Sequence, residues 1–353
     1  YEILIGLVGS EMCIRDRDMI LHQSDALLTT SKWKLLKNRT SGTTGTPLTV
    51  FEDWKSIWRE QAYFYCYRKR CGYTYGQPLV SLRGNLGKKD TMMYVHISNT
   101  LYLSSYNINE QTVWAYYKGI EKRSPRAIEG YPSSLYNLAL LLKDKGLYCN
   151  IPVCFTSSEN LLDFQRQLIE ERFHTKIFDH YGTTERTIRI SESIKHDGYF
   201  EDPGYSINEY LKDRVISTSL INSAFPLIRY QSSDVVILKE NTKDERVSID
   251  RIQGRSGNCI KGKDGSIYNN AALTFILTYS HNIRYAQFIQ KKNGKVLLNI
   301  VPEAVFSSQN LDELKQMIDL KIGLSNLELE INLIKEQDLI YTTRNKYSYI
   351  ISE

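Results

Sequence analysis

The stretch from Ile151 to Glu185 decides the fold, and it reads IPVCFTSSENLLDFQRQLIEERFHTKIFDHYGTTE. It begins with a short apolar run at Ile151–Thr156, which is typical of a buried strand. Leu161–Phe173 follows with the spacing of an amphipathic helix, and Lys176–Tyr181 is a second strand-like run. A strand, a helix and a strand in this order predict two parallel strands joined by a right-handed crossover. The sequence therefore predicts an α/β protein.

Segments on both sides continue this alternation. Pro132–Lys145 carries leucines at helical spacing and is followed by Gly146, a residue that commonly ends helices. Residues 52–70 have the pattern of an aromatic-rich helix, and strand-like runs follow at Arg214–Ile221 and Asp234–Lys239. These elements predict one large body of mixed and parallel sheets with helices.

The pattern changes near Gly254. Asn-Gly at 293–294 lies between two strand-like runs, which is a strong hairpin signal. The elements expected after Gly254 are a helix, a hairpin, a helix and a strand, at Ala271–Thr278, Arg284–Gln290 with Val296–Val301, Leu311–Ile322 and Leu327–Ile334. We therefore predict an N-terminal body at residues 18–254 and a small α+β C-terminal lid at residues 255–353.

The chain opens with a stretch that differs from both domains. Ile3–Val8 is apolar, but no basic segment precedes it and the run is short for a signal peptide. The string GSEMCIRDR resembles a translated sequencing adaptor. We therefore expect Tyr1–Arg17 to be a non-native leader and the functional chain to start near Asp18.

Composition and charge narrow the classes of function. Hydrophobic residues make up 42% of the chain and charged residues 24%, as in globular proteins. The net charge is only +5, and the aromatic and basic run at 63–75 fits a core-facing helix with solvated basic side chains, so no nucleic-acid partner is expected. No apolar run reaches the length of a membrane span. The 6 cysteines form no Cys-x-x-Cys pair, which favours reduced thiols and a cytoplasmic location.

The segment Thr40-Ser-Gly-Thr-Thr-Gly-Thr-Pro-Leu48 alternates hydroxyl side chains with glycines. Backbone N–H and side-chain O–H groups of such a loop converge on phosphate oxygens, and glycine permits the close approach. The loop is not a Walker motif, because Gly-x4-Gly-Lys-Ser/Thr is absent. Taken alone, a loop of this composition is more often a linker. It becomes a candidate phosphate site only together with other segments.

Two carboxylates later in the chain belong to the other segments that make this loop a candidate phosphate site. Glu185 ends the run Asp179-His-Tyr-Gly-Thr-Thr-Glu185 after a predicted parallel strand, where α/β sheets place their ligands. A carboxylate in this place suits Mg²⁺ beside a phosphate. Asp234 follows Phe225-Pro-Leu-Ile-Arg-Tyr230 and is a candidate acceptor for both hydroxyls of a ribose. Either acid alone is more often a surface carboxylate or a helix cap.

Together and in this order, the segments resemble the adenylate-forming superfamily of acyl-CoA ligases, luciferases and peptide-synthetase adenylation domains. Within it they resemble the phenylacetate–CoA ligase branch and its CapK-type proteins of capsular polysaccharide biosynthesis. The matching segments are Thr40–Leu48, Leu103–Tyr106, Gly130–Ser133, Thr156–Glu159, Tyr181–Glu185, Thr218–Tyr230 with Asp234, Gly254-Arg255 and Asn345-Lys346. The resemblance runs from about Asp18 to the end, and family members carry a longer segment before the phosphate loop. The front portion of the body is therefore expected to be missing.

The resemblance implies an ATP-dependent, AMP-forming ligase in which a small carboxylic acid attacks the α-phosphate and the acyl group then passes to CoA. It implies that Lys346 is catalytic by bridging the carboxylate and the α-phosphate, that Thr184 hydrogen-bonds to the α-phosphate, and that Glu185 binds Mg²⁺. The implied nucleotide-binding residues are Thr40, Ser41, Gly42, Thr43, Thr44 and Gly45 at the β- and γ-phosphates, Glu159, Tyr181 and Gly182 near adenine, Thr184 and Glu185, and Asp234 and Arg255 at the ribose.

Three alternatives stay open for the chemistry after nucleotide binding. The acceptor is CoA or, in a CapK-type enzyme, an amine or hydroxyl of a surface-polysaccharide precursor, and the implied residues are common to both. A nucleotide-binding relic without adenylation is the third alternative, favoured by Asn258 and Asn345, which replace a carboxylate and a glycine of the family pattern. The identity of the acid and the oligomeric state are left open by the sequence, although Val95–Asn99 and Leu103–Tyr106 are expected to border the acid pocket.

Overall fold

The structure is a computed structural model, and it describes residues 14–39, 48–83, 86, 90–211, 214–232, 234–239, 248–255, 259–264, 266–269, 273, 281–341 and 347–352. The chain divides into two compact units, of which the first comprises Tyr1–Leu161 with Leu168–Ile252 and the second Leu162–Gln167 with Gln253–Glu353. The predicted limits of leader, body and lid remain predictions.

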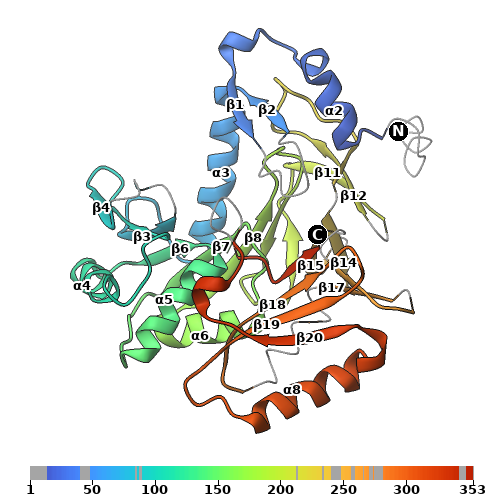
Figure 1. The fold of residues 1–353 in the computed structure, drawn as a ribbon. Coiled ribbons are helices and arrows are strands. Elements are labelled where there is room, and N and C mark those ends of the chain that lie inside the picture. Colours follow the sequence, from blue (N-terminus) through green and yellow to red (C-terminus); the bar gives the residue numbers. More distant parts are fainter. Residues whose placement is uncertain are drawn as a thin grey trace. The chain divides into compact units, whose positions relative to one another are not determined.

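The first unit is built on a ten-stranded sheet (Figure 1). In spatial order its strands are β14 (Asp234–Leu238), β15 (Ser248–Arg255), β10 (Tyr199–Glu201), β9 (Arg189–Glu192), β8 (Lys176–Gly182), β7 (Val153–Ser157), β6 (Ala127–Gly130), β3 (Leu79–Arg83), β5 (Thr100–Ser104) and β4 (Met92–Val95). The central strands from β8 to β5 run parallel. The pairs β4–β5, β8–β9, β9–β10 and β10–β15 are antiparallel. A sheet of mixed direction is what the sequence predicts.

The decisive segment forms the predicted strand, helix and strand. β7 and β8 pair in parallel from Val153↔Lys176 to Ser157↔His180, and α6 (Asp163–Phe173) lies between them in the chain. Every residue of β7 is buried, which explains why its sequence is a continuous apolar run. The α/β fold is therefore confirmed.

Two further helices of this unit have ends that their local sequence explains. α3 (Trp54–Arg70) is capped by Asp53, whose side chain accepts a hydrogen bond from the Ser56 N–H, and Gly72 follows it with a φ of +95°. α5 (Pro132–Asp144) starts with proline in its first turn, where no N–H is needed. The other helices are α2 (Arg17–Gln23) and α4 (Val113–Arg123). Among the described residues, no helix is both long enough and apolar enough to cross a bilayer.

Two small antiparallel sheets complete the first unit. One is the hairpin of β1 (Leu36–Arg39) and β2 (Thr49–Glu52), and the other consists of β11 (Ser206–Leu211), β12 (Arg214–Ser219) and β13 (Tyr230–Ser232). The pair Arg39↔Thr49 joins the two ends of residues 40–48. The predicted phosphate loop is therefore bracketed by a hairpin.

The last residues of the predicted leader contact this part of the fold. Arg15 forms a parallel bridge with Tyr230, and its Nη1 donates to the Ile228 carbonyl at 2.8 Å. Asp16 caps α2 by accepting a 2.8 Å hydrogen bond from the Met19 N–H. The origin of Tyr1–Arg17 remains a prediction, but its end contributes hydrogen bonds beside β13.

The second unit is a small α+β fold. Its four-stranded sheet has the order β20 (Leu329–Leu333), β19 (Val296–Pro302), β18 (Ile283–Gln290) and β21 (Ile350–Ser352), and its other elements are α8 (Ser308–Lys321) and the pair β16 (Cys259–Lys261) and β17 (Ile267–Asn269). β18 and β19 form the predicted hairpin, and Gly294 adopts a φ of +89° in its turn. The predicted helix at Ala271–Thr278 lies outside the described residues except for Leu273.

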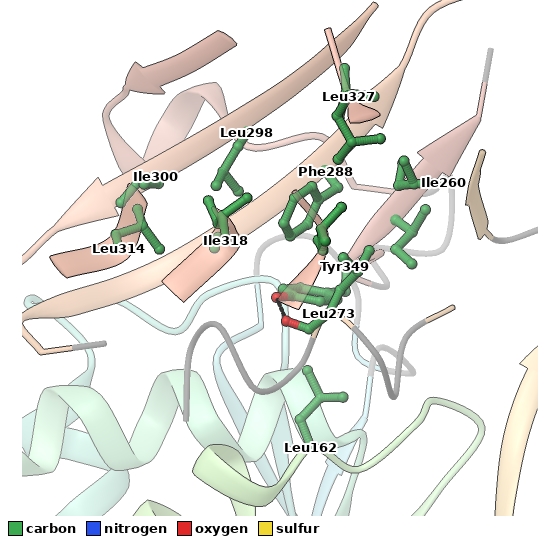
Figure 2. Packing of buried hydrophobic residues seen from close by; sticks show 14 residues of the cluster. Leu162, Ile260, Leu273, Phe288, Leu298, Ile300, Leu314, Ile318, Leu327 and Tyr349 are labelled. Carbon is green, nitrogen blue, oxygen red and sulfur yellow. Dashed lines mark hydrogen bonds between the residues drawn. The ribbon is translucent and has the colours of Figure 1, made fainter. Parts of the chain in front are cut away.

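One apolar core holds the second unit together (Figure 2). Phe288, Leu298 and Ile300 of the sheet pack with Leu314 and Ile318 of α8, and all five side chains are buried. Burial of such side chains contributes about 1.5–3 kcal/mol each. The apolar residues of 311–322 recur at helical spacing, and those of β19 recur at alternate positions. As these patterns predict, the two sets therefore face one another.

The cysteines give the first testable prediction. Of the described cysteines, Cys66 is exposed, whereas Cys71, Cys149, Cys154 and Cys259 are buried. Burial raises the pKa of the Cys71 thiol to about 11 and that of Cys149 to about 12. We expect a thiol reagent at about pH 8 to modify Cys66 quickly and Cys71 and Cys149 only after unfolding, because the thiolate is the reactive form. Peptide mass spectrometry with and without denaturant measures this, and fast labelling of Cys149 in the native protein would contradict it.

Candidate nucleotide-binding site

The turn after β8 carries two of the predicted site residues. β8 ends at Gly182, and Thr184 and Glu185 follow it in the turn. The Arg186 N–H donates to the Thr183 carbonyl at 3.1 Å, and the hydroxyls of Thr183 and Thr187 lie 3.1 Å apart. The turn is thus closed by its own hydrogen bonds at the carboxyl end of a parallel strand, the position at which α/β sheets bind ligands.

Tyr181 and Asp234 lie together although they are 53 positions apart. The Tyr181 hydroxyl donates to Asp234 Oδ2 at 2.5 Å, and the Ser232 hydroxyl donates to the same oxygen at 3.3 Å. Burial, together with the neighbouring carboxylate, raises the pKa of the Tyr181 hydroxyl well above its ordinary value. Tyr181 is therefore a proton donor at neutral pH, and the carboxylate of Asp234 is held at the start of β14.

Glu185 lies in the same cluster. Its Oε1 accepts a 3.3 Å hydrogen bond from the Tyr230 hydroxyl and lies 3.9 Å from Nη1 of Arg17. Burial raises the pKa of the Glu185 carboxyl, and the negative charge of Asp234 acts in the same direction, although Arg17 opposes it. A bound cation would reverse this effect by favouring the ionised form. One carboxylate whose side chain is still 12% exposed fits Mg²⁺, because Mg²⁺ in nucleotide sites is held by one or two carboxylates and by substrate phosphates.

The predicted adenine-side segments also come together. Gly130 pairs with Thr156 across β6 and β7, and Glu159 Oε2 accepts a 3.0 Å hydrogen bond from the Ser133 N–H near the start of α5. The Thr156 hydroxyl donates to Asp179 Oδ1 at 2.7 Å and thereby joins the end of β7 to β8. Segments at 130–133, 156–159 and 179–185 thus lie at the carboxyl ends of neighbouring parallel strands.

Part of the predicted site lies outside the described residues. This holds for Thr40, Ser41, Gly42, Thr43, Thr44 and Gly45, for Lys346 and for the side chain of Arg255. Their assigned roles remain predictions. Among the residues that the structure does describe, no group of three or more His, Cys, Asp or Glu side chains is arranged to hold a metal ion.

Gln287 anchors both flanks of the segment that contains Lys346. Its side chain is buried in β18, and its Nε2 donates to the carbonyls of Ile340 and Ser348, each at 2.9 Å. Its Oε1 accepts a 3.1 Å hydrogen bond from the Ile340 N–H, and Tyr341 and Tyr347 form an antiparallel bridge. Gln287 is not among the predicted site residues, although an amide at an inward position of an apolar strand is a signal because a buried amide requires partners.

A second set of side chains outside the prediction surrounds the turn after β8. We call Glu52, Glu60, Arg186, Arg189 and Asp202 the charge network. Arg186 contacts Glu52 at 3.0 Å and Glu60 at 2.9 Å, and Arg189, which is 1% exposed, contacts Asp202 at 2.7 Å. Burial lowers the pKa of the Arg186 guanidinium, but the two carboxylates outweigh this and raise it above its ordinary value. No local pattern signals such a network, because contacting partners such as Glu52 and Arg186 are 134 positions apart.

No family model matches the chain. Protein CapK of Staphylococcus aureus is 25% identical over 305 residues, which cover 81% of this chain and 67% of CapK. Among solved structures, 2-hydroxyisobutyryl-CoA ligase in complex with R3-HIB-AMP is similar with a TM-score of 0.74 at 13% identity, covering 98% of this chain and 81% of the ligase.

Two further structures show the same fold similarity. The anthranilate CoA ligase AuaEII with anthranoyl-AMP has a TM-score of 0.60 at 15% identity, covering 90% of this chain and 66% of the ligase. ATP-bound MatB from Rhodopseudomonas palustris has a TM-score of 0.54 at 12% identity, covering 88% of this chain and 65% of MatB. The protein therefore has the fold of the adenylate-forming acyl-CoA ligases and is similar in sequence to CapK, in agreement with the fold and the resemblance predicted from its motifs.

Proposed function

We propose that the protein is an ATP-dependent, AMP-forming carboxylate ligase. The observation that carries this proposal is that Asp234, from the start of β14, lies in one cluster with Tyr181 and Glu185 of the segment at the end of β8. The fold similarity to CoA ligases with bound acyl-AMP or ATP supports the same function. ATP, Mg²⁺ and a small carboxylic acid are the proposed ligands, and the cytoplasm is the proposed location.

In the first half-reaction, a carboxylate oxygen of the acid attacks the α-phosphorus of ATP, and pyrophosphate leaves. Thr184 would donate a hydrogen bond to an α-phosphate oxygen, and Asp234 would accept from the ribose hydroxyls while Tyr181 lies beside the base. Mg²⁺ bound at Glu185 would neutralise negative charge on the phosphates. Lys346 would bridge the acid and the α-phosphate as charge builds. The work is positioning and electrostatic stabilisation.

In the second half-reaction, we propose that a thiol, CoA, attacks the acyl carbonyl and AMP leaves, which yields a thioester. The family pattern implies that rotation about Arg255–Asn258 withdraws Lys346 before this step. The similarity to CapK favours a second candidate, in which an amine or hydroxyl of a surface-polysaccharide precursor takes the acyl group. Both candidates share the adenylation step.

The test is ATP–pyrophosphate exchange across a panel of carboxylic acids that includes phenylacetate and other aryl acids. We expect exchange that depends on one class of acid and is lost when EDTA removes Mg²⁺. AMP release that rises with CoA supports the thioester, whereas release that rises only with an amino or hydroxyl sugar supports the second candidate. Nucleotide binding without exchange for any acid would contradict the ligase and favour a nucleotide-binding relic.

A further inference from the structure

We propose that Arg186 is a positioning residue that holds the turn bearing Thr184 and Glu185 against β2, the strand after the phosphate loop. This inference rests on the proposed function, because it concerns the alignment of two phosphate-binding segments. Arg186 itself is assigned no contact with substrate.

The contacts of Arg186 run from the turn to the loop's exit strand. Its Nε lies 3.0 Å from Oε1 of Glu52 and its Nη2 lies 3.4 Å from Oε2, so the pair is two-pronged. Glu52 ends β2, which pairs with β1 on the other side of residues 40–48. A single guanidinium therefore joins the strand after the phosphate loop to the turn after β8.

The partners of Arg186 are themselves fixed. The Tyr205 hydroxyl donates to Glu60 Oε2 at 2.6 Å, and Glu60 Oε1 faces both Arg186 at 2.9 Å and Arg189 at 3.6 Å. Asp202 forms one ion pair with Arg189 at 2.7 Å and a second ion pair with the more exposed Arg70 at 3.3 Å. With Arg70 included, three guanidinium groups face three carboxylates. Such a network defines one arrangement, because a displaced member would leave a buried charge without its partner.

The backbone of Arg186 points to the same role. Its φ is +59°, a left-handed conformation that glycine adopts more easily than residues with a side chain. The Ser219 hydroxyl donates to its carbonyl at 2.7 Å, which holds the strained peptide in place. The backbone conformation at this position suits glycine, and the contacts of the Arg186 side chain with Glu52 and Glu60 explain why an arginine is found there.

The experiment compares Arg186→Lys and Arg186→Met with the control Arg70→Gln, each in the 353-residue chain. Arg70 contacts the same network through Asp202, but its side chain is 59% exposed, whereas that of Arg186 is 21% exposed. We expect both Arg186 variants to raise the Mg²⁺ concentration for half-maximal exchange and the KM for ATP roughly tenfold, with Lys less affected than Met, because a misplaced turn misaligns both phosphate segments. Arg70→Gln should keep wild-type values.

Thermal unfolding is measured in parallel, so that misfolding is not mistaken for misalignment. If Arg186→Met does not fold, Glu52→Gln removes the charge of the partner at nearly constant size and is held to the same expectation. Folded variants with wild-type Mg²⁺ and ATP dependence would overturn the inference. Wild-type protein that neither binds ATP nor exchanges pyrophosphate would overturn the proposed function and this inference with it. If the wild type exchanges pyrophosphate normally and the Arg186 variants show the same Mg²⁺ and ATP dependence as the wild type, only the inference about Arg186 is overturned.

Discussion

Lys346→Ala is expected to slow acyl-adenylate formation by at least roughly a hundredfold, the scale on which removing one preorganised charge stabiliser acts. The reason is that negative charge accumulates between the attacking carboxylate and the α-phosphate, where the proposed ammonium group lies. The measurement is ATP–pyrophosphate exchange with an acid that responds in the wild type.

The half-reactions separate this role from a loss of structure. Acyl transfer from a supplied acyl-adenylate to the acceptor should persist in Lys346→Ala, because the lysine is proposed to act only in the first step. Lys292→Ala is the matched control, since Lys292 is exposed in the hairpin turn of the same unit. Exchange at the wild-type rate in Lys346→Ala would contradict the assignment of this lysine.

Asp234→Ala is expected to lower kcat/KM for ATP roughly a hundredfold. The carboxylate is proposed to accept from both ribose hydroxyls, and two hydrogen bonds to a charged group at about 1.5 kcal/mol each sum to about 3 kcal/mol. The wild type should discriminate against 2′,3′-dideoxy-ATP by a similar factor. Steady-state kinetics with both nucleotides measures whether the variant has lost that discrimination.

Two variants control for the contacts that Asp234 makes within the protein. Tyr181→Phe removes the hydroxyl that donates to Asp234 at 2.5 Å and keeps the ring, so a few-fold effect is expected. Glu201→Ala breaks a similar pair, in which the Tyr210 hydroxyl donates to Glu201 at 2.5 Å, and should leave nucleotide selectivity intact. An Asp234→Ala variant that still prefers ATP over the dideoxy analogue would refute the ribose assignment.

Much of the fold was predictable because its signals are local. The apolar runs that became β7 and β8 lie only as far apart as one helix requires, and Asn-Gly at 293–294 specifies a hairpin by backbone geometry alone. The antiparallel strands β9 and β10 were not predicted. They have four and three residues and mix charged with apolar side chains, so no periodicity distinguishes them from loops.

The candidate site, like the fold, has one part that could be predicted from the sequence and one part that could not. Tyr181, Glu185 and Asp234 were selected through the order of motifs in a known superfamily, and their proximity depends on how the sheet brings β8 and β14 into one unit. Arg186 and Glu52 were not selected, because an ion pair across 134 positions leaves no pattern along the chain. Residues recognised by motif were thus predictable, whereas the side chains that hold the motifs in place emerged only from the fold.

Gln287 also provides a spectroscopic handle on Lys346. The Ile340 amide proton is bonded to the Gln287 side chain at 3.1 Å, six positions before the lysine. Its chemical shift and its rate of exchange with deuterium therefore report whether the base of the lysine segment is closed or open. Following that one signal through addition of ATP, acid and acceptor would track the lysine segment without altering the lysine.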